Sequence, residues 1–174
     1  MKSRVAVVTG ASQGIGRSTA IRLARDFSAI VLVARNGEAL EEVAVAVRAV
    51  GAEALACALD LSQVEASETL IHKTLDRFGR IDALLNIAGA VPQIDLEMTD
   101  DQWKAGMELK LHGARRLTIR AWEALKQSKG SVVFMSGSAR LIRNRHSRLS
   151  PLRTPQSVRS PRRLRSMVLR MERK

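Results

Sequence analysis

Short apolar runs alternate along the chain with longer segments in which apolar residues recur at helical spacing. The runs cover residues 4–8, 29–34, 54–59, 82–86 and 131–135. Runs of this length that are rich in small and β-branched residues are typical of strands buried on both faces. We therefore predict five strands at these positions.

The segments between these runs are predicted to be helices. They cover residues 15–27, 40–50, 64–78 and 103–125, with apolar residues every three or four positions. Gly51, Gly79 and Gly130 stand where the last three helices would end. Because strands and helices alternate throughout, we expect a parallel sheet with helices on both faces.

This regularity stops after Ser138, and the composition changes. Residues 140–174 hold 12 of the 29 Lys and Arg but only one of the 17 Asp and Glu, so nearly all of the formal net charge of +12 lies there. Three prolines obstruct a continuous helix, and only residues 164–171 could form a short basic one. The sequence predicts one domain over residues 1–139 and a basic, disordered tail over 140–174.

Other features limit the classes of protein to consider. No apolar run approaches the roughly 18 residues that span a bilayer, and the N-terminus does not look like a secretory signal. The single cysteine, Cys57, lies in an apolar run and is expected to be buried. His72 and His146 have no partner spacing that suggests a metal site. These features predict a soluble, cytoplasmic protein without a metal ion.

A glycine-rich loop, TGASQGIG, joins the first predicted strand to the first helix at residues 9–16. Glycines in this position allow a tight turn and close approach to a pyrophosphate, whose charge the helix N-terminus stabilises. A simple turn is the alternative, but the strand–loop–helix context favours nucleotide binding. The candidate binding residues in the loop are Gly10, Ser12, Gln13, Gly14, Ile15 and Gly16.

The glycine spacing, with three residues between Gly10 and Gly14, resembles that of the short-chain dehydrogenase/reductase family. Asp60-Leu61, after the third strand, is similar to the family's adenine-contacting segment, although a turn or helix N-cap aspartate is the simpler interpretation. The segment Asn86-Ile87-Ala88-Gly89 resembles the family's Asn-Asn-Ala-Gly, with Ile87 replacing the second Asn. An ordinary strand end would explain those four residues alone, but the three matches together span residues 5 to about 138.

The resemblance implies a doubly wound, Rossmann-like α/β fold with strand order 3-2-1-4-5, here truncated after about five strands. Residues 1–139 would be the NAD(P)-binding domain. The implied activity is oxidation or reduction of a small carbonyl or alcohol substrate. The family also uses its fourth helix for subunit contacts, so a homo-oligomer through residues 100–127 is expected, with Trp103 and Trp122 on the exposed apolar face.

The residues near the second strand indicate which nicotinamide cofactor is bound. An NAD site usually has an acidic residue about 20 positions beyond the glycines. The chain has Arg35 there, and Arg17 directly follows the loop. A guanidinium suits the 2′-phosphate of NADP. Either arginine alone could be a solvated surface residue, but the pair favours NADP over NAD.

The catalytic residues that the resemblance implies are largely missing. The family uses a Tyr as proton donor and a Lys four residues later, whereas this chain contains no tyrosine and reads Leu-Ser-Pro-Leu-Arg-Thr at residues 149–154. The family's serine role falls to Ser138 or Ser136, and an ungapped register places Gly137 there. Lys110 occupies the position of the family's helix Asn, where it is either a substituted relay residue or a solvated lysine.

Two explanations of the tail remain. A reading-frame change would replace the family's C-terminal part with arginine-rich sequence, and we favour it over a selected basic segment. The alternative function is a non-enzymatic nucleotide- or polyanion-binding protein that uses the tail. Nucleic acid is the less favoured partner, because residues 140–174 contain no aromatic residue for stacking and no recognisable recognition helix.

Overall fold

The computed structural model describes residues 3–89, 99–136 and 167–169. Its strands are β1 (Val5–Thr9), β2 (Ala29–Ala34), β3 (Glu53–Ala58), β4 (Ala83–Asn86), β5 (Ser131–Phe134) and β6 (Met167–Leu169). Its helices are α1 (Gly14–Leu23), α2 (Gly37–Val50), α3 (Val64–Phe78), α4 (Asp100–Met107), the π-helical segment η1 (Glu108–Gly113) and α5 (Ala114–Ser128).

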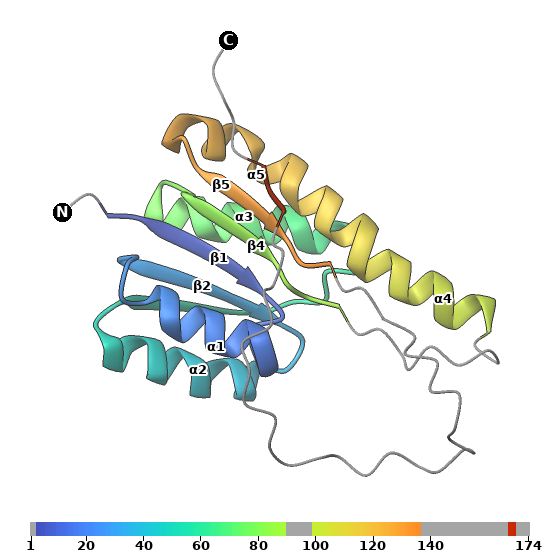
Figure 1. Cartoon of the computed structure of the whole chain (residues 1–174), viewed down its shortest axis with the longest axis horizontal. Helices are drawn as coiled ribbons and strands as arrows, with labels where there is room; N and C mark the ends of the chain where they lie inside the picture. The colour runs from blue at the N-terminus through green and yellow to red at the C-terminus, as the bar shows by residue number, and fades with distance from the viewer. Residues whose placement is uncertain (1–2, 90–98, 137–166, 170–174) are drawn as a thin grey trace, which may run out of the picture.

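The sheet has the order β3-β2-β1-β4-β5-β6, and β1 to β5 are parallel (Figure 1). This confirms the predicted Rossmann-like order of the first five strands. Strand β1 lies at the centre, where Val7 pairs with Val31 of β2 on one side and with Leu84 of β4 on the other. Strands β2 and β3 are thus added on one side of β1, and β4 and β5 on the other side, so the order of the strands reverses between β1 and β4. In open α/β sheets, ligands bind in the crevice at the carboxyl ends of the strands beside such a switch point.

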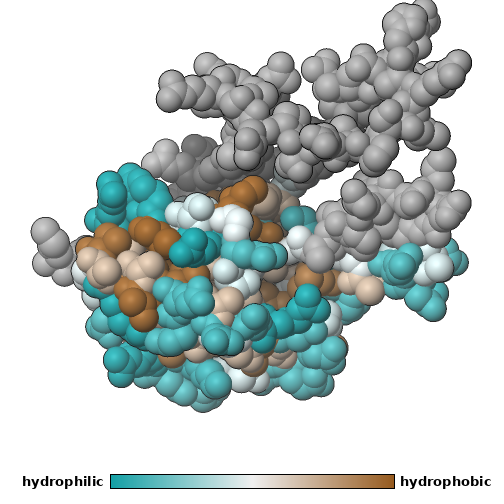
Figure 2. Space-filling model, turned by 90° about the horizontal axis from the view of Figure 1, so that it is seen from below, coloured by the Kyte–Doolittle hydropathy of each residue, from teal (hydrophilic) through white to brown (hydrophobic). Residues whose placement is uncertain are grey.

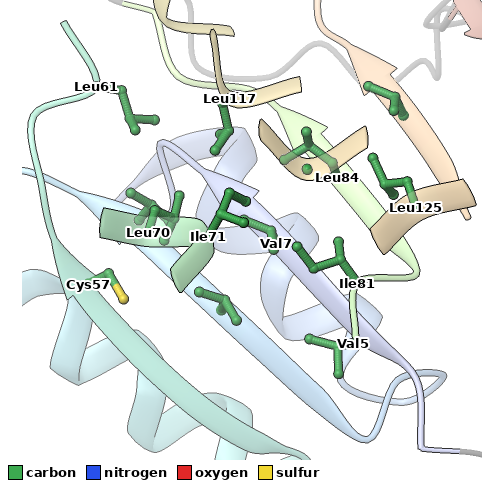
Figure 3. Close-up of a cluster of buried hydrophobic side chains, with 14 of the residues drawn as sticks. Val5, Val7, Cys57, Leu61, Leu70, Ile71, Ile81, Leu84, Leu117 and Leu125 are labelled. Carbon is green, nitrogen blue, oxygen red and sulfur yellow. The ribbon is translucent and has the colours of Figure 1, made fainter. Parts of the chain in front are cut away.

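Two hydrophobic layers cover the sheet, because successive side chains of each strand point to opposite faces. Val5 and Val7 pack with buried residues of α3 and α5, among them Leu70 and Leu117 (Figure 3). Ala6 and Val8 of the same strand face the other layer, which α1 and α2 supply. Both faces of β1 are therefore buried, as the apolar run predicts.

The outer surfaces of the helices are mostly polar. On the side where α1 and α2 lie in Figure 1, hydrophilic side chains cover much of the surface and hydrophobic ones gather in smaller patches (Figure 2). Among the described residues, no helix combines the length and apolar character needed to cross a membrane.

Two of the three predicted glycines are the C-caps of their helices, and the third has a different role. Gly51 and Gly79 are the left-handed C-caps of α2 and α3, with φ of 107° and 70°. At the end of α5, however, Lys129 takes the left-handed conformation, with φ of 55°. The next residue, Gly130, is needed for another reason, since a Cβ atom there would lie 2.7 Å from the carbonyl oxygen of Asp82.

The fourth predicted helix begins at Asp100 but is not uniform. The π-helical segment η1 interrupts it between α4 and α5. At the end of η1, Gly113 packs against the turn after β3, and a Cβ atom on it would lie 2.5 Å from the carbonyl oxygen of Leu61. Apolar periodicity alone did not distinguish this wider turn from a continuous α-helix.

Residues 167–169 do not form part of the short basic helix that residues 164–171 could have made. They form β6, in which Val168 pairs antiparallel with Val133 of β5. Strand β5 is therefore not a free edge at these positions. A row of unpaired backbone groups on an edge strand is a template for a further strand, which gives a physical reason for the pairing.

Candidate functional site

A cavity of about 570 Å³ lies at the carboxyl ends of the strands, at the predicted switch point. Of the thirteen residues expected to bind a cofactor, all but Arg17 and Asn86 line it. The structure thus brings together the glycine loop, the end of β2, the turn after β3 and the segment after β4. Other lining residues that sequence reasoning did not single out include Asn36, Ala39, Leu109 and Met135.

The glycine loop is shaped by close backbone contacts. A Cβ atom on Gly16 would overlap the carbonyl oxygen of Gly10, so α1 can start against the end of β1 only because that side chain is missing. Gly10 has φ of 68°, and a Cβ atom on it would lie 2.9 Å from Cα of Ala88. Gly14 also has a positive φ, 54°, but has open space around it.

The N-terminus of α1 offers donors to this cavity. Its N-cap residue is Gln13, whose side chain makes no capping hydrogen bond, and the first turn holds no acidic residue. The first amides of a helix have no partner within the helix and carry its positive end. A phosphate group satisfies both requirements, so the loop and helix together fit a pyrophosphate.

Thr9 is a structural residue of the site that sequence reasoning missed. Its buried hydroxyl accepts hydrogen bonds from the N–H groups of Ile87 and Ala88, both at 2.9 Å, and donates to the carbonyl oxygen of Leu85 at 3.3 Å. This one side chain therefore fixes the segment after β4 against the end of β1. A threonine that ends an apolar run gives little indication of such a role.

Asp60 is held in a tight turn at the end of the cavity near β3. Its Oδ1 accepts from the N–H of Ser62 at 3.0 Å and from the Ser62 hydroxyl at 2.8 Å. The bond from the Ser62 N–H lowers the pKa of Asp60, and the Ser62 hydroxyl and the positive charge of Arg35 lower it further. The carboxylate therefore makes the contacts expected of a turn aspartate, and Asp60 also lines the cavity.

Arg116 of α5 attaches this turn to the π-helical segment. Its Nη2 donates to the carbonyl oxygen of Ser62 at 3.0 Å, and its Nη1 lies 2.6 Å from Oε1 of Glu108 in η1. The guanidinium is largely buried, so the pair is screened less than an exposed one. This contact couples the position of Asp60 to η1 and α5.

Of the two arginines proposed for cofactor choice, only Arg35 lines the cavity. Arg35 follows β2 and lines the cavity, with its charge felt by Asp60. Arg17 is exposed on α1 and does not line the cavity. Next to Arg35, Asn36 caps α2 by accepting from the N–H of Ala39 at 3.1 Å, which fixes the backbone at this end of the site.

Asn86 lies behind the cavity wall. It is 5% exposed, and its Nδ2 donates to the Thr118 hydroxyl at 3.2 Å. Its carbonyl oxygen accepts from the N–H of Met135 at 3.0 Å, while its Oδ1 has no partner among the described residues. Asn86 therefore joins β4 to α5 and β5, and it is not among the residues that line the cavity.

The predicted catalytic residues are only partly described. Ser138 lies outside the described residues, and Ser136 is exposed after β5. Lys110 is half-buried in η1, and burial lowers its pKa. Its side chain lies beside Gly89, because a Cβ atom on that glycine would be 2.6 Å from Cδ and 3.1 Å from Nζ of Lys110. Within the described ranges, no cluster of three His, Cys, Asp or Glu side chains is placed to hold a metal ion.

Comparisons with known proteins assign the family. The family model for short chain dehydrogenases matches residues 4–147, beyond the point where the motifs end, so the chain belongs to the short-chain dehydrogenase family. It is 34% identical over 147 residues to a 3-oxoacyl-[acyl-carrier-protein] reductase of Synechocystis, an alignment that covers 83% of this chain and 60% of that protein. The chain spans about half the length of the curated relatives it matches.

Solved structures agree in fold. The chain is similar to an alcohol dehydrogenase of the archaeon Thermococcus sibiricus complexed with 5-hydroxy-NADP, with a TM-score of 0.75, 35% identity, and coverage of 81% of this chain and 62% of that one. It is also similar to an NAD+-bound xylitol dehydrogenase, with a TM-score of 0.67, 31% identity, and coverage of 74% and 51%. The predicted fold and the resemblance are thereby confirmed.

Gly16→Ala should disrupt the glycine loop, because the new methyl group overlaps Gly10 and the backbone must shift. We expect a loss of about 1–3 kcal/mol in the free energy of unfolding, which urea denaturation measures. Gly106→Ala in α4 is the control, since its Cβ atom would meet open space, and it should stabilise the chain by up to about 1 kcal/mol. Equal effects of the two substitutions would contradict the crowded geometry of the loop.

Proposed function

We propose that this chain is an NADP-binding member of the family, related to reductases and dehydrogenases of small carbonyl or alcohol substrates, and that it binds the cofactor without efficient turnover. The observation that carries the proposal is the cavity at the switch point. In it, the side-chain-free Gly10–Gly16 loop and the uncapped N-terminus of α1 fit a pyrophosphate, while Arg35 stands where the 2′-phosphate is expected.

Arg35 supports NADP rather than NAD. It lines the cavity after β2, where an NAD site would carry an acidic residue. The two similar structures include one with an NADP derivative and one with NAD+, so the choice depends on this chain's own residues. Asp60, kept ionised by the Ser62 turn, supplies an acceptor for the adenine amino group.

A proton donor for the chemical step is the missing part. A bound nicotinamide supplies the hydride, but the developing alkoxide on the substrate also needs an acid at hydrogen-bond distance. The 174 residues contain no tyrosine. Lys110, half-buried beside Gly89, is the candidate replacement for the family's tyrosine. Loss of general acid help alone typically costs about 10²–10⁴-fold in rate.

Cofactor titration tests the proposal. Arg35→Ala should weaken NADPH binding by about tenfold or more, since a charge-assisted contact is lost, and should change NADH binding little. Arg22→Ala is the matched control, because this exposed arginine of α1 pairs with Asp26 and does not line the cavity, and it should change neither affinity. The affinities of both variants are measured by NADPH fluorescence.

Turnover is tested separately with a panel of ketones and 3-oxoacyl esters, with which the chain should consume NADPH negligibly. Turnover near one per second would contradict catalytic impairment and make Lys110 the first residue to mutate.

We also propose self-association through the apolar face of α4, η1 and α5. Trp103, Leu111 and Trp122 are 58%, 51% and 40% exposed, and exposed patches of this kind mark contact surfaces. Replacing Trp103 and Trp122 by Ser should shift the chain toward monomer in sedimentation velocity. Val45→Ser, at an exposed position of α2 in the other helical layer, is the control. A wild-type chain that is monomeric at all concentrations tested would refute the interface.

The origin of the basic segment is a further part of the proposal. We attribute the change of composition at residues 140–174 to a reading-frame change rather than to selection for polyanion binding. Translation of the gene beyond codon 138 in the other two frames should then yield a Tyr-x-x-x-Lys element. If neither frame contains one, the alternative of a polyanion-binding tail gains support, and its binding should weaken steeply with salt.

A further inference from the structure

Lys110 places a positive charge beside one particular half of the cavity, next to Gly89, although it is not itself a lining residue. The charged residues that line the cavity, Arg35 and Asp60, follow β2 and β3. Gly89 lines it on the other side of the switch point, after β4, and the Lys110 side chain occupies the space beside that glycine. The two ends of the cavity therefore differ in the charges that a long ligand would meet.

The fold determines which part of a dinucleotide meets Lys110. A doubly wound sheet binds one mononucleotide on each side of its switch point, and the 2′-phosphate end belongs with β2. The adenosine half therefore lies with Arg35 and Asp60, and the nicotinamide half lies with the segment after β4. Lys110 lies beside that second half, its Nζ being 3.1 Å from the Cβ position of Gly89.

The charge of Lys110 is not neutralised by its described neighbours. Glu108, two residues away, pairs with Arg116 at 2.6 Å, and Asp101 pairs with Lys104 at 3.7 Å. Within residues 3–89 and 99–136, no salt bridge involves Lys110. Burial lowers its pKa. The side chain is only half-buried, so solvent still stabilises its ammonium form.

We propose that Lys110 makes the site select the reduced cofactor. The nicotinamide ring of NADP+ carries a positive charge that the dihydronicotinamide ring of NADPH lacks, and the rest of the two molecules is the same. Repulsion by the ammonium therefore weakens binding of the oxidised form only. This inference rests on the proposed function and deepens it, since the same repulsion opposes hydride donation as positive charge develops on the ring.

The expected size of this preference for NADPH over NADP+ follows from Coulomb's law. Two unit charges several ångströms apart in a partly solvated site should change the ratio of dissociation constants by about tenfold. Salt should reduce the effect, because part of the site is open to solvent. Binding of a ligand that contains only the adenosine half should be unaffected.

The test compares three ligands on the full chain by calorimetry: NADPH, NADP+ and 2′,5′-ADP, which lacks the nicotinamide. Lys110→Gln should lower the ratio of Kd for NADP+ to Kd for NADPH by about tenfold. Lys110→Arg should preserve the ratio, since it preserves the charge. Lys104→Gln is the control, because this exposed lysine pairs with Asp101 on α4, and it should also leave the ratio unchanged.

The outcomes separate this inference from the proposed function. If 2′,5′-ADP fails to bind the wild-type chain, the proposed NADP site is wrong. If 2′,5′-ADP binds normally and Lys110→Gln leaves the ratio unchanged, the site stands and selection by Lys110 is overturned. If Lys110→Gln impairs folding, a salt series on the wild-type chain decides: a ratio that falls with ionic strength supports the repulsion, and a constant ratio refutes it.

Discussion

The close approach of three backbone segments at one point governs the whole site. The end of β1, the start of α1 and the segment after β4 meet where neither Gly10 nor Gly16 can carry a side chain. Thr9 secures the same junction, because its hydroxyl binds two consecutive N–H groups after β4. The cavity forms because the chain has no bulk there, and the positive end of α1 reaches it for the same reason.

The cavity's two ends are connected by α5 as well as by the sheet. Arg116 binds the carbonyl oxygen of Ser62 and the carboxylate of Glu108, and Gly113 lets the helix approach Leu61 closely. Displacement of this helix would therefore change the turn that holds Asp60 and the placement of Lys110 together. In the proposed NADP complex, the contact to the adenosine part and the charge beside the nicotinamide half would depend on one shared element, although their residues are far apart in sequence.

Local pattern predicted much of the fold and part of the site. The five apolar runs gave the parallel strands to within one residue at each end, because strands buried on both faces leave continuous apolar sequence. The glycine loop was recognisable because its spacing reflects backbone contacts. Thr9 and Arg116 were not, since their roles arise from partners more than 50 positions away. Arg17 seemed equivalent to Arg35, but it is exposed on α1 and does not line the cavity.

The π-helical segment makes the orientation of the helix faces depend on the number of residues it contains. Between Glu108 and Gly113 the helix holds more residues per turn than the α-helices on either side. The faces of α4 and α5 are thus rotated relative to those of a continuous α-helix, and Lys110 sits within the widened turn. A relative one codon shorter in this stretch could keep every motif of the glycine loop and yet present a different side chain to Gly89. Insertions and deletions in this stretch, as well as substitutions, can therefore change which side chain lies beside Gly89.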